Sequence, residues 1–513
     1  MKRNKTELLI VVAILAVAAF FRFYQIDSIP PGLYPDEAMN GNDALYALET
    51  GEFKLFYPNN NGREGLFINT QALFISFLGN KAWVLRLVSA IFGTLTVWGL
   101  YLLSKELFNR NIGYFSSFLL SILLWHVNFS RIGFRAIMLP FILVFGFYFF
   151  WKGLKYGHLK DFIIAGVFGG LGFHTYISYR VAPLIAIVVF LNYWYYLKKD
   201  FSHSKYTHAR QQLLRGFIVF VGVVALVVLP LLVYFLTNEG AFLSRSGSQL
   251  SVFGQKEPFK ELSLSIAKTL GMFNFYGDSN WRHNMSESPQ LFWPIGSLFV
   301  IGFIKELVHW LKRKHGHFST SHTFLFTWFF VMLLPGFLSV EAPHALRTIG
   351  VIPVAMIFAA LGLWWVYEKL HHMLIMFELD KHKAHQKHLV LNLTMIIFLL
   401  ALGIVEYDRY FNRWAKQVDD AFAKRYADIA QTLNEQPLEN EKYIVVNADG
   451  GLIEIPGSSQ LVPMPAQTVM FLTDTFTYQK QLDKNLFYLT EEEYENTKEQ
   501  ISPESLVIFL EPK

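Results

Sequence analysis

Long apolar segments recur along most of this 513-residue chain, and they constrain its fold more than any other feature. A membrane-crossing helix needs about 20 mostly apolar residues. On that basis we predict a mainly α, polytopic membrane protein with about eleven transmembrane helices. Their approximate ranges are 7–24, 83–104, 112–129, 136–154, 162–178, 181–197, 214–236, 290–311, 322–339, 349–367 and 389–407.

Composition agrees with this class of protein. Hydrophobic residues make up 53% of the chain and charged residues 17%, below the roughly 25% of a soluble domain. The chain has no cysteine, which excludes disulfides, thiolate catalysis and Cys-ligated metals. The net charge of +5 comes from basic residues between the apolar segments, a pattern that indicates orientation rather than nucleic-acid binding.

Lys and Arg gather in alternate loops, which predicts the direction of insertion. The short loops on the poorer side contain only Arg131, Arg135, Arg180 and Arg347. Because cytoplasmic loops are the richer in these residues, we expect an integral plasma-membrane protein with a cytoplasmic N-terminus. An odd number of spans then places the C-terminus outside the cytoplasm. Cleavage of the first helix as a signal peptide is an alternative, but the many later spans make an uncleaved helix simpler.

Two outer loops are long, at about 25–82 and 237–289. Each contains a segment too short or too polar to span, 66–78 and 259–275, which we expect to form interfacial helices. After residue 408 the long apolar runs stop, and 442–447 and 505–510 are typical of short buried strands. We therefore divide the chain into a transmembrane domain, 1–409, and a small α+β extracytoplasmic domain, 410–513.

Two adjacent carboxylates, Asp36 and Glu37, follow the first predicted span in the motif Tyr34-Pro35-Asp36-Glu37. A carboxylate on the outer side can serve as a general base that accepts a proton from an attacking hydroxyl. A solvated loop or the start of a short helix explains the same residues. Both interpretations stay open at this point.

Arg63 and Glu64 lie between two glycines, directly before the first interfacial segment. Glu64 is a candidate for positioning an acceptor and Arg63 for binding phosphate, because a guanidinium group binds two oxygens at once. An Arg–Glu pair in a tight turn is the simpler alternative.

Arginine also recurs with histidine or tyrosine at the other outer turns. One such arginine most simply reaches for lipid headgroups, whereas several together favour a phosphate site. The histidines lack helical metal-ligand spacing, so the sequence gives no metal site. The candidate substrate-binding residues here are Arg131, Arg135, His174, Tyr176, Arg180, Arg282, His283, His344 and Arg347.

These motifs resemble those of the GT-C superfamily of membrane glycosyltransferases, in particular its protein O-mannosyltransferase and aminoarabinose-transferase-like branch of phospholipid carrier-dependent enzymes. The resemblance covers about residues 1–370. It is carried by the Tyr34–Ala38 motif, by Gly62-Arg63-Glu64-Gly65, and by Pro343-His344-Ala345-Leu346-Arg347. The C-terminal 100 residues do not resemble the sugar-binding repeats of eukaryotic protein mannosyltransferases, so no acceptor is implied.

The resemblance implies a GT-C bundle that transfers a hexose or pentose from a polyprenyl-phosphate carrier, with inversion, to a hydroxyl of a protein, lipid or glycan. Asp36 is then the expected catalytic base, Glu37 its support, and Arg347 a contact to the lipid phosphate. We expect membrane lipids as further partners and no nucleic acid. No cofactor is required, and a divalent metal is left open.

Two other functions fit the same spans. A flippase of lipid-linked sugars is expected to place ionisable residues near the bilayer midplane on broken helices, and few such residues stand in mid-span. A non-catalytic envelope-assembly protein has no need of Asp36.

Overall fold

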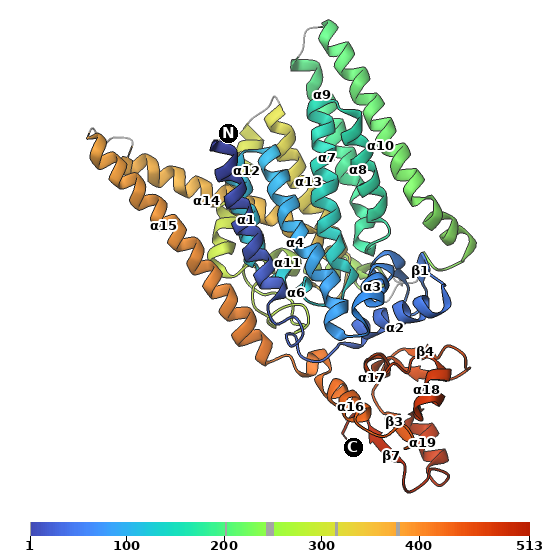
Figure 1. Ribbon diagram of the computed structural model, residues 1–513. Helices are drawn as coiled ribbons and strands as arrows, with labels where there is room; N and C mark the ends of the chain where they lie inside the picture. The colour runs from blue at the N-terminus through green and yellow to red at the C-terminus, as the bar shows by residue number, and fades with distance from the viewer. Residues whose placement is uncertain (1, 201–202, 243–250, 313–316, 376–379, 513) are drawn as a thin grey trace.

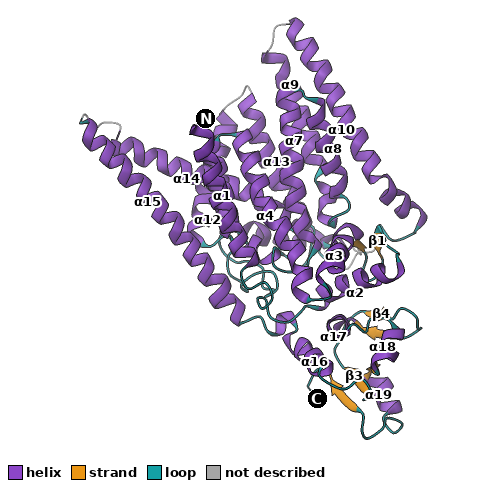
Figure 2. Cartoon of the chain, in the orientation of Figure 1, coloured by secondary structure: helices purple, strands orange, loops and turns teal. Residues whose placement is uncertain are grey.

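The computed structural model describes residues 2–200, 203–242, 251–312, 317–375 and 380–512. Most of the chain forms a bundle of long helices, and the C-terminal residues form a small domain at the opposite end of the bundle from the start of α1 (Figure 1). Five of the seven strands of the described residues, β3 to β7, belong to this domain (Figure 2).

Nine helices of the described residues are long and apolar enough to cross a membrane. The predicted count of eleven is therefore not confirmed. The nine long helices of the bundle are α1 (Lys2–Phe23), α4 (Ala82–Leu107), α7 (Met138–Tyr156), α9 (Pro183–Asp200), α10 (His203–Thr237), α12 (Trp293–Lys312), α13 (His317–Phe337), α14 (Ile352–Ile375) and α15 (Lys381–Tyr407).

The two remaining predicted spans are short or broken. The first is divided at Leu123 into α5 (Arg110–Ile122) and α6 (Leu124–Phe129), and the second contains α8 (Leu159–Gly172). The break leaves helix-end carbonyls that need donors. Arg22 of α1 donates to the carbonyls of Ser121 (2.9 Å) and Leu120 (3.2 Å), and it also contacts His126 of α6 at 2.7 Å. A buried arginine thus stabilises the break.

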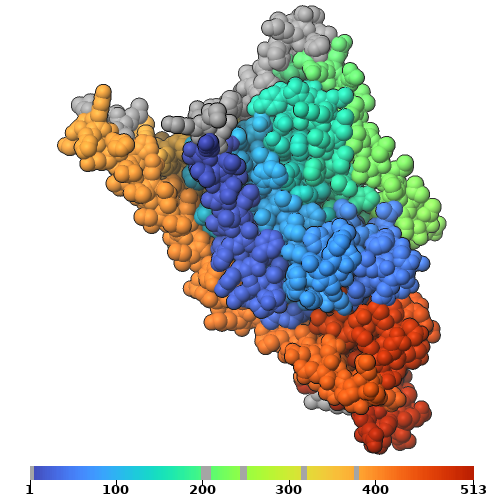
Figure 3. Space-filling view, viewed as in Figure 1, coloured from blue at the N-terminus to red at the C-terminus, as the bar shows by residue number. Residues whose placement is uncertain are grey.

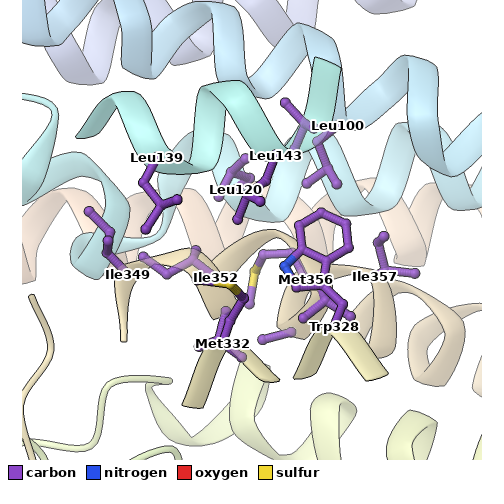
Figure 4. Packing of buried hydrophobic residues seen from close by; sticks show 14 of the residues in the cluster. Leu100, Leu120, Leu139, Leu143, Trp328, Met332, Ile349, Ile352, Met356 and Ile357 are labelled. Carbon is purple, nitrogen blue, oxygen red and sulfur yellow. The ribbon is translucent and has the colours of Figure 1, made fainter. Parts of the chain in front are cut away.

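The core of the bundle is built from aliphatic and aromatic side chains of helices distant in sequence. Figure 4 shows leucines of α4, α5 and α7 facing Trp328, Met332 and Met356 of α13 and α14. Glycine allows the backbones of α12 and α14 to approach closely. A Cβ on Gly302 of α12 would lie 1.9 Å from the Phe358 carbonyl of α14, so only glycine fits there.

The two long loops contain the helices that the sequence predicts there. Residues 66–78 form most of α3 (Gly65–Leu78), which buries Phe67 and Ile68 and exposes Phe77. Residues 259–271 form most of α11 (Pro258–Gly271), on which Phe259 is exposed. Helix α2 (Pro35–Thr50) was not predicted as a long element. It lies in the same loop as the short hairpin β1 (Phe56–Tyr57) and β2 (Arg63–Glu64), between α1 and α3.

The C-terminal domain has a parallel three-stranded sheet in the order β6-β3-β7. The two predicted strands are present as β3 (Lys442–Val446) and β7 (Leu506–Phe509), and β6 (Leu486–Thr490) was not predicted. The other elements that follow α15 are η6 (Asp408–Arg413), η7 (Trp414–Lys416), η8 (Asp420–Phe422), α16 (Lys424–Asn434), β4 (Leu452–Glu454), β5 (Leu461–Pro463), η9 (Met464–Ala466), α17 (Gln467–Thr473), α18 (Tyr478–Lys484) and α19 (Glu491–Thr497).

Helix α17 of this domain packs on α2, and Figure 3 shows the two regions in direct surface contact. Asn42 donates to the carbonyl of Gln467 at 3.1 Å and to its side-chain oxygen at 2.9 Å. A Cβ on Gly41 would lie 2.4 Å from the Phe471 ring, which is fully buried. The C-terminal domain therefore supports the helix that begins with the acidic pair.

Candidate active site

The acidic pair occupies the first turn of α2. Tyr34 is extended, and Pro35 stands at the first helical position, where its fixed φ favours helix initiation. Asp36 and Glu37 follow at the positive end of the helix dipole, which stabilises carboxylates. Successive residues on a helix point about 100° apart, so the two side chains enter different surroundings.

Glu37 is fully buried and lies in the protein interior. One of its carboxylate oxygens, Oε2, accepts from the Gly133 N–H at 2.6 Å and from Nε of Arg86 at 3.3 Å. Arg86 in turn donates to the carbonyls of Pro30 (2.6 Å) and Gly32 (2.7 Å). Glu37 therefore ties α2 to α4 and to the 130–135 turn.

Asp36 is half-buried and lines a polar cavity of about 80 Å³. Its carboxylate accepts a hydrogen bond from the Asn60 side chain. The other lining residues come from α2, the hairpin and three further turns. They are Asn40, Asn60, Arg63, Phe134, Arg135, Ala136, Tyr176 and Leu346.

Both arginines of this cavity are held by carboxylates. Arg63 forms an ion pair with Asp43 and donates to Asn40 at 2.8 Å. Burial raises the pKa of Asp43, and the charge of Arg63 opposes that rise. Arg135 pairs with Glu64 at 2.8 Å, and its guanidinium lies 5.6 Å from the centre of the Tyr176 ring. The predicted Arg63–Glu64 turn thus makes two separate ion pairs at one cavity.

Tyr34 connects Asp36 to the second long loop. The guanidinium of Arg282 lies 4.0 Å from the centre of the Tyr34 ring. Burial, together with the negative charge of Asp36, raises the pKa of Tyr34 to about 12. The phenol therefore stays protonated at neutral pH and is available as a donor beside Asp36.

Three residues predicted to bind substrate make contacts within the protein. Arg131 is fully buried and donates to the carbonyls of Phe21 (3.1 Å), Gln25 (3.0 Å) and Ile29 (2.8 Å). His174 lies 3.0 Å from the carbonyl of Val227, and Arg180 donates to that of Phe242 at 2.8 Å. None of these three lines the polar cavity.

The predicted binding residues on the two late loops, the segment before α12 and the turn between α13 and α14, form a second polar group. Arg347 binds the Ser339 hydroxyl and the Glu341 carboxylate, and its carbonyl accepts from Ser178 at 3.0 Å. His283 and His344 have ring centres 5.0 Å apart, and both face Asp278. The neighbouring Leu346 lines the polar cavity, which places this loop at its edge.

An apolar cavity of about 240 Å³ lies among α7, α8, α9 and α10. Phe147, Phe150, Phe217 and Phe220 are among its lining residues. Tyr179 in η2 (Ile177–Val181) also lines it, three residues after Tyr176 of the polar cavity. One short segment therefore borders both a polar and an apolar cavity.

Solved membrane transferases share this architecture. Oligosaccharyltransferase AglB from Archaeoglobus fulgidus, in complex with an inhibitory peptide and a dolichol-phosphate, aligns with a TM-score of 0.56 at 14% identity, over 96% of this chain and 70% of that one. ArnT from Cupriavidus metallidurans bound to undecaprenyl phosphate aligns with a TM-score of 0.54 at 14% identity, over 98% and 89%. These similarities confirm the predicted fold, a GT-C-like bundle whose long apolar helices suit a membrane.

Sequence comparison agrees with this fold. The family model of dolichyl-phosphate-mannose-protein mannosyltransferases matches residues 66–234, which run from α3 into α10. A search of curated proteins gives no significant match.

Sequence reasoning missed several residues of the site. Asn40 and Asn60 gave no motif, although Asn40 follows Asp36 at the four-residue spacing of one helix face. Asp278 was not grouped with His344 because the two stand on different loops. The apolar cavity had no signal distinct from that of ordinary membrane helices.

Proposed function

We propose that this protein is an inverting glycosyltransferase that moves a hexose or pentose from a polyprenyl-phosphate carrier to an acceptor hydroxyl at the outer membrane face. Asp36 acts as the general base. The observation that carries this proposal is the divergence of the acidic pair, because Asp36 faces a polar cavity while Glu37 is fixed in the interior.

The two cavities suit the two halves of a lipid-linked donor. The apolar cavity provides an aromatic surface for isoprenoid units, and the polar cavity provides carboxylate, amide and guanidinium groups for a sugar. AglB and ArnT were solved with dolichol-phosphate and undecaprenyl phosphate respectively, which supports a polyprenyl-phosphate donor here. The segment around Tyr176 and Tyr179 then lies at the junction between lipid and sugar.

The chemistry requires a base on one side of the sugar and positive charge on the other. A lipid phosphate is a good leaving group, so charge stabilisation is more important than a general acid. Arg347 and Arg282 are suited to this role, because Arg347 follows Leu346 of the cavity and Arg282 lies against Tyr34, two residues before Asp36. Of the two, Arg347 has a half-exposed carboxylate partner, Glu341, which an incoming phosphate can replace.

Glu37 then has a structural role. By holding the first turn of α2 against Gly133, it fixes the backbone that positions Asp36. Arg63 and Glu64 shape the acceptor side, with Arg135 fixing Glu64. We place this face of the protein outside the cytoplasm, with the N-terminus inside. The C-terminal domain, 410–513, is extracytoplasmic under the same orientation.

The decisive experiment incubates purified protein with a panel of polyprenyl-phosphate sugars and measures donor consumption. Asp36→Asn should lower the rate by about 10²–10⁴ while leaving the unfolding temperature unchanged. Asp27→Asn is the matched control, because Asp27 is an exposed carboxylate of the same loop and does not line the cavity. Near-normal transfer by Asp36→Asn would refute the base assignment. NMR of the product reports whether the anomeric configuration is inverted.

A further inference from the structure

A third cavity, of about 270 Å³, lies where the C-terminal domain meets the start of α2. One wall comes from the residues just before and at the beginning of α2, and the C-terminal domain provides the rest. The residues that line this interdomain cavity are Tyr34, Pro35, Asp420, Ala423, Lys424, Arg425, Tyr426, Pro465 and Glu511. They line neither the polar nor the apolar cavity, so the interdomain cavity is separate from the proposed donor site.

The interdomain cavity lies next to the proposed base. Tyr34 borders the cavity, and Asp36 stands two residues further on, in the first turn of α2. Consecutive Cα atoms are about 3.8 Å apart, so the Cα atoms of Tyr34 and Asp36 are at most about 7.6 Å apart. Burial and then the charge of Asp36 raise the pKa of Tyr34 to about 12, which places the two side chains close together. A molecule in the interdomain cavity can therefore extend past Tyr34 to Asp36.

The two walls of the interdomain cavity are held against each other by close backbone contacts. A Cβ on Gly32 would lie 2.4 Å from the carbonyl oxygen of Phe422, so only glycine fits there. The Thr468 hydroxyl donates to the carbonyl of Leu33 at 2.8 Å. The cavity is therefore preformed, as binding sites for small molecules usually are.

The lining combines aromatic surface with hydrogen-bond donors and acceptors. Tyr34 and Tyr426 provide two phenol rings, and the Tyr426 hydroxyl donates to the Glu511 carboxylate. Burial and then this hydrogen bond raise the pKa of Tyr426, so the phenol keeps its proton. Asp420 and Lys424 are exposed and can reach a ligand that arrives from solvent. A ring with an apolar face and a polar tip suits a ligand that has both C–H surface and hydroxyl groups.

The charges of the lining balance each other. Two carboxylates, Asp420 and Glu511, offset the two basic side chains of the cavity. One of the basic side chains, Arg425, already donates to the carbonyl of Leu510 at 2.9 Å. A phosphate ligand is typically held by an excess of positive charge, and this lining has no such excess. The lining therefore favours an uncharged ligand with many hydroxyl groups.

The elements around the interdomain cavity are unlike those that bind peptides. Its C-terminal lining residues belong to η8, the first turn of α16, η9 and the chain after β7, and none of them belongs to a strand. Extended peptides commonly add to the edge of a sheet, and helical peptides lie in long apolar grooves. A closed space between turns and helix ends suits a compact ring better than an extended chain.

We propose that the interdomain cavity binds an uncharged sugar unit and, resting on the proposed function, that the acceptor is therefore a glycan. A hydroxyl of the bound glycan extends past Tyr34 to Asp36. Its proton passes to the Asp36 carboxylate, and its oxygen bonds to the anomeric carbon of the donor sugar. The bond from that carbon to the phosphate oxygen breaks, and its electron pair leaves with the lipid phosphate.

The first experiment measures binding alone. The full-length chain in detergent is mixed with the methyl glycosides of glucose, galactose, mannose and N-acetylglucosamine, and saturation-transfer difference NMR measures each affinity. We expect at least one glycoside to bind. Asp420→Ala should raise its Kd about tenfold, because a charge-assisted hydrogen bond is lost. Asp428→Ala is the control, because Asp428 is an exposed carboxylate of α16 that does not line the cavity.

A second experiment separates this inference from the proposed function. Asp36→Asn should bind the glycoside as tightly as the wild type, while donor consumption falls as predicted above. In the otherwise wild-type chain supplied with donor, Asp420→Ala should raise the KM for the glycoside about tenfold and leave the KM for the donor unchanged. If Asp36→Asn transfers normally while glycoside binding still depends on Asp420, the base assignment fails and the sugar site stands.

Three results would overturn the sugar site. The first is a wild-type chain that binds none of the glycosides, and the second is an Asp420→Ala chain that binds them as tightly as the wild type. The third is an uncharged peptide containing serine and threonine that binds in an Asp420-dependent manner when no glycoside does, which would make the acceptor a protein.

Discussion

The loop between α1 and α4 and the two late loops, residues 272–292 and 338–348, carry similar charged residues in different states. Around α2, Arg86 and Arg63 are buried, and each forms an ion pair with a carboxylate. Arg131 is also buried, and it donates to backbone carbonyls. In the late loops, Arg347 pairs with a half-exposed Glu341, and His344 has an unused ring nitrogen. The buried arginines of the first region are therefore held on all sides by the protein, whereas Arg347 of the second region has a half-exposed partner that the proposed phosphate can replace.

The largest effect should come from removing the charge of Glu37. Glu37→Gln leaves Arg86 as an uncompensated buried cation, which typically costs about 3–5 kcal/mol. Glu341→Gln breaks an exposed pair and should cost no more than about 1 kcal/mol. Thermal unfolding in detergent compares the two variants. Equal losses would show that the two regions do not differ in the way described.

Arg347→Ala should have an intermediate effect, on donor use rather than stability. Loss of one charge-assisted contact to phosphate should raise the KM for the donor about tenfold. Arg413→Ala is the control. Arg413 is exposed, forms an ion pair with Asp408 at 2.6 Å, and lines neither cavity. Steady-state kinetics across a range of donor concentrations measure this, and unchanged kcat and KM would argue against a phosphate role.

The smallest effect is expected at Tyr34, where the two regions meet. Tyr34→Phe removes one donor beside Asp36, so the rate should fall about fivefold. Because the pKa of Tyr34 is raised to about 12, the phenol does not ionise in an ordinary assay. The pH–rate profiles of variant and wild type should therefore have the same shape between about pH 5 and pH 10. A basic limb present in the wild type and lost in Tyr34→Phe would contradict this.

Apolar length and local motifs were enough to predict the fold class, a helix in each of the two long loops, and strands β3 and β7. They were not enough to count the spans, because a run of apolar residues does not reveal the break at Leu123 or the 14-residue length of α8. The motif around Asp36 was visible because its residues are adjacent. Which arginines are already paired depends on contacts such as Arg131 with Ile29, which no local spacing reveals.

The packing of α17 against α2 has a consequence for biosynthesis. The ribosome makes the acidic pair among the first forty residues, but Gln467 and Phe471, which hold the other face of that helix, emerge more than four hundred residues later. A nascent chain with most of its helices inserted would still lack this support. Under the proposed function, we therefore expect catalytic competence to arise only after the segment that contains Gln467 and Phe471 has been made and has packed on α2.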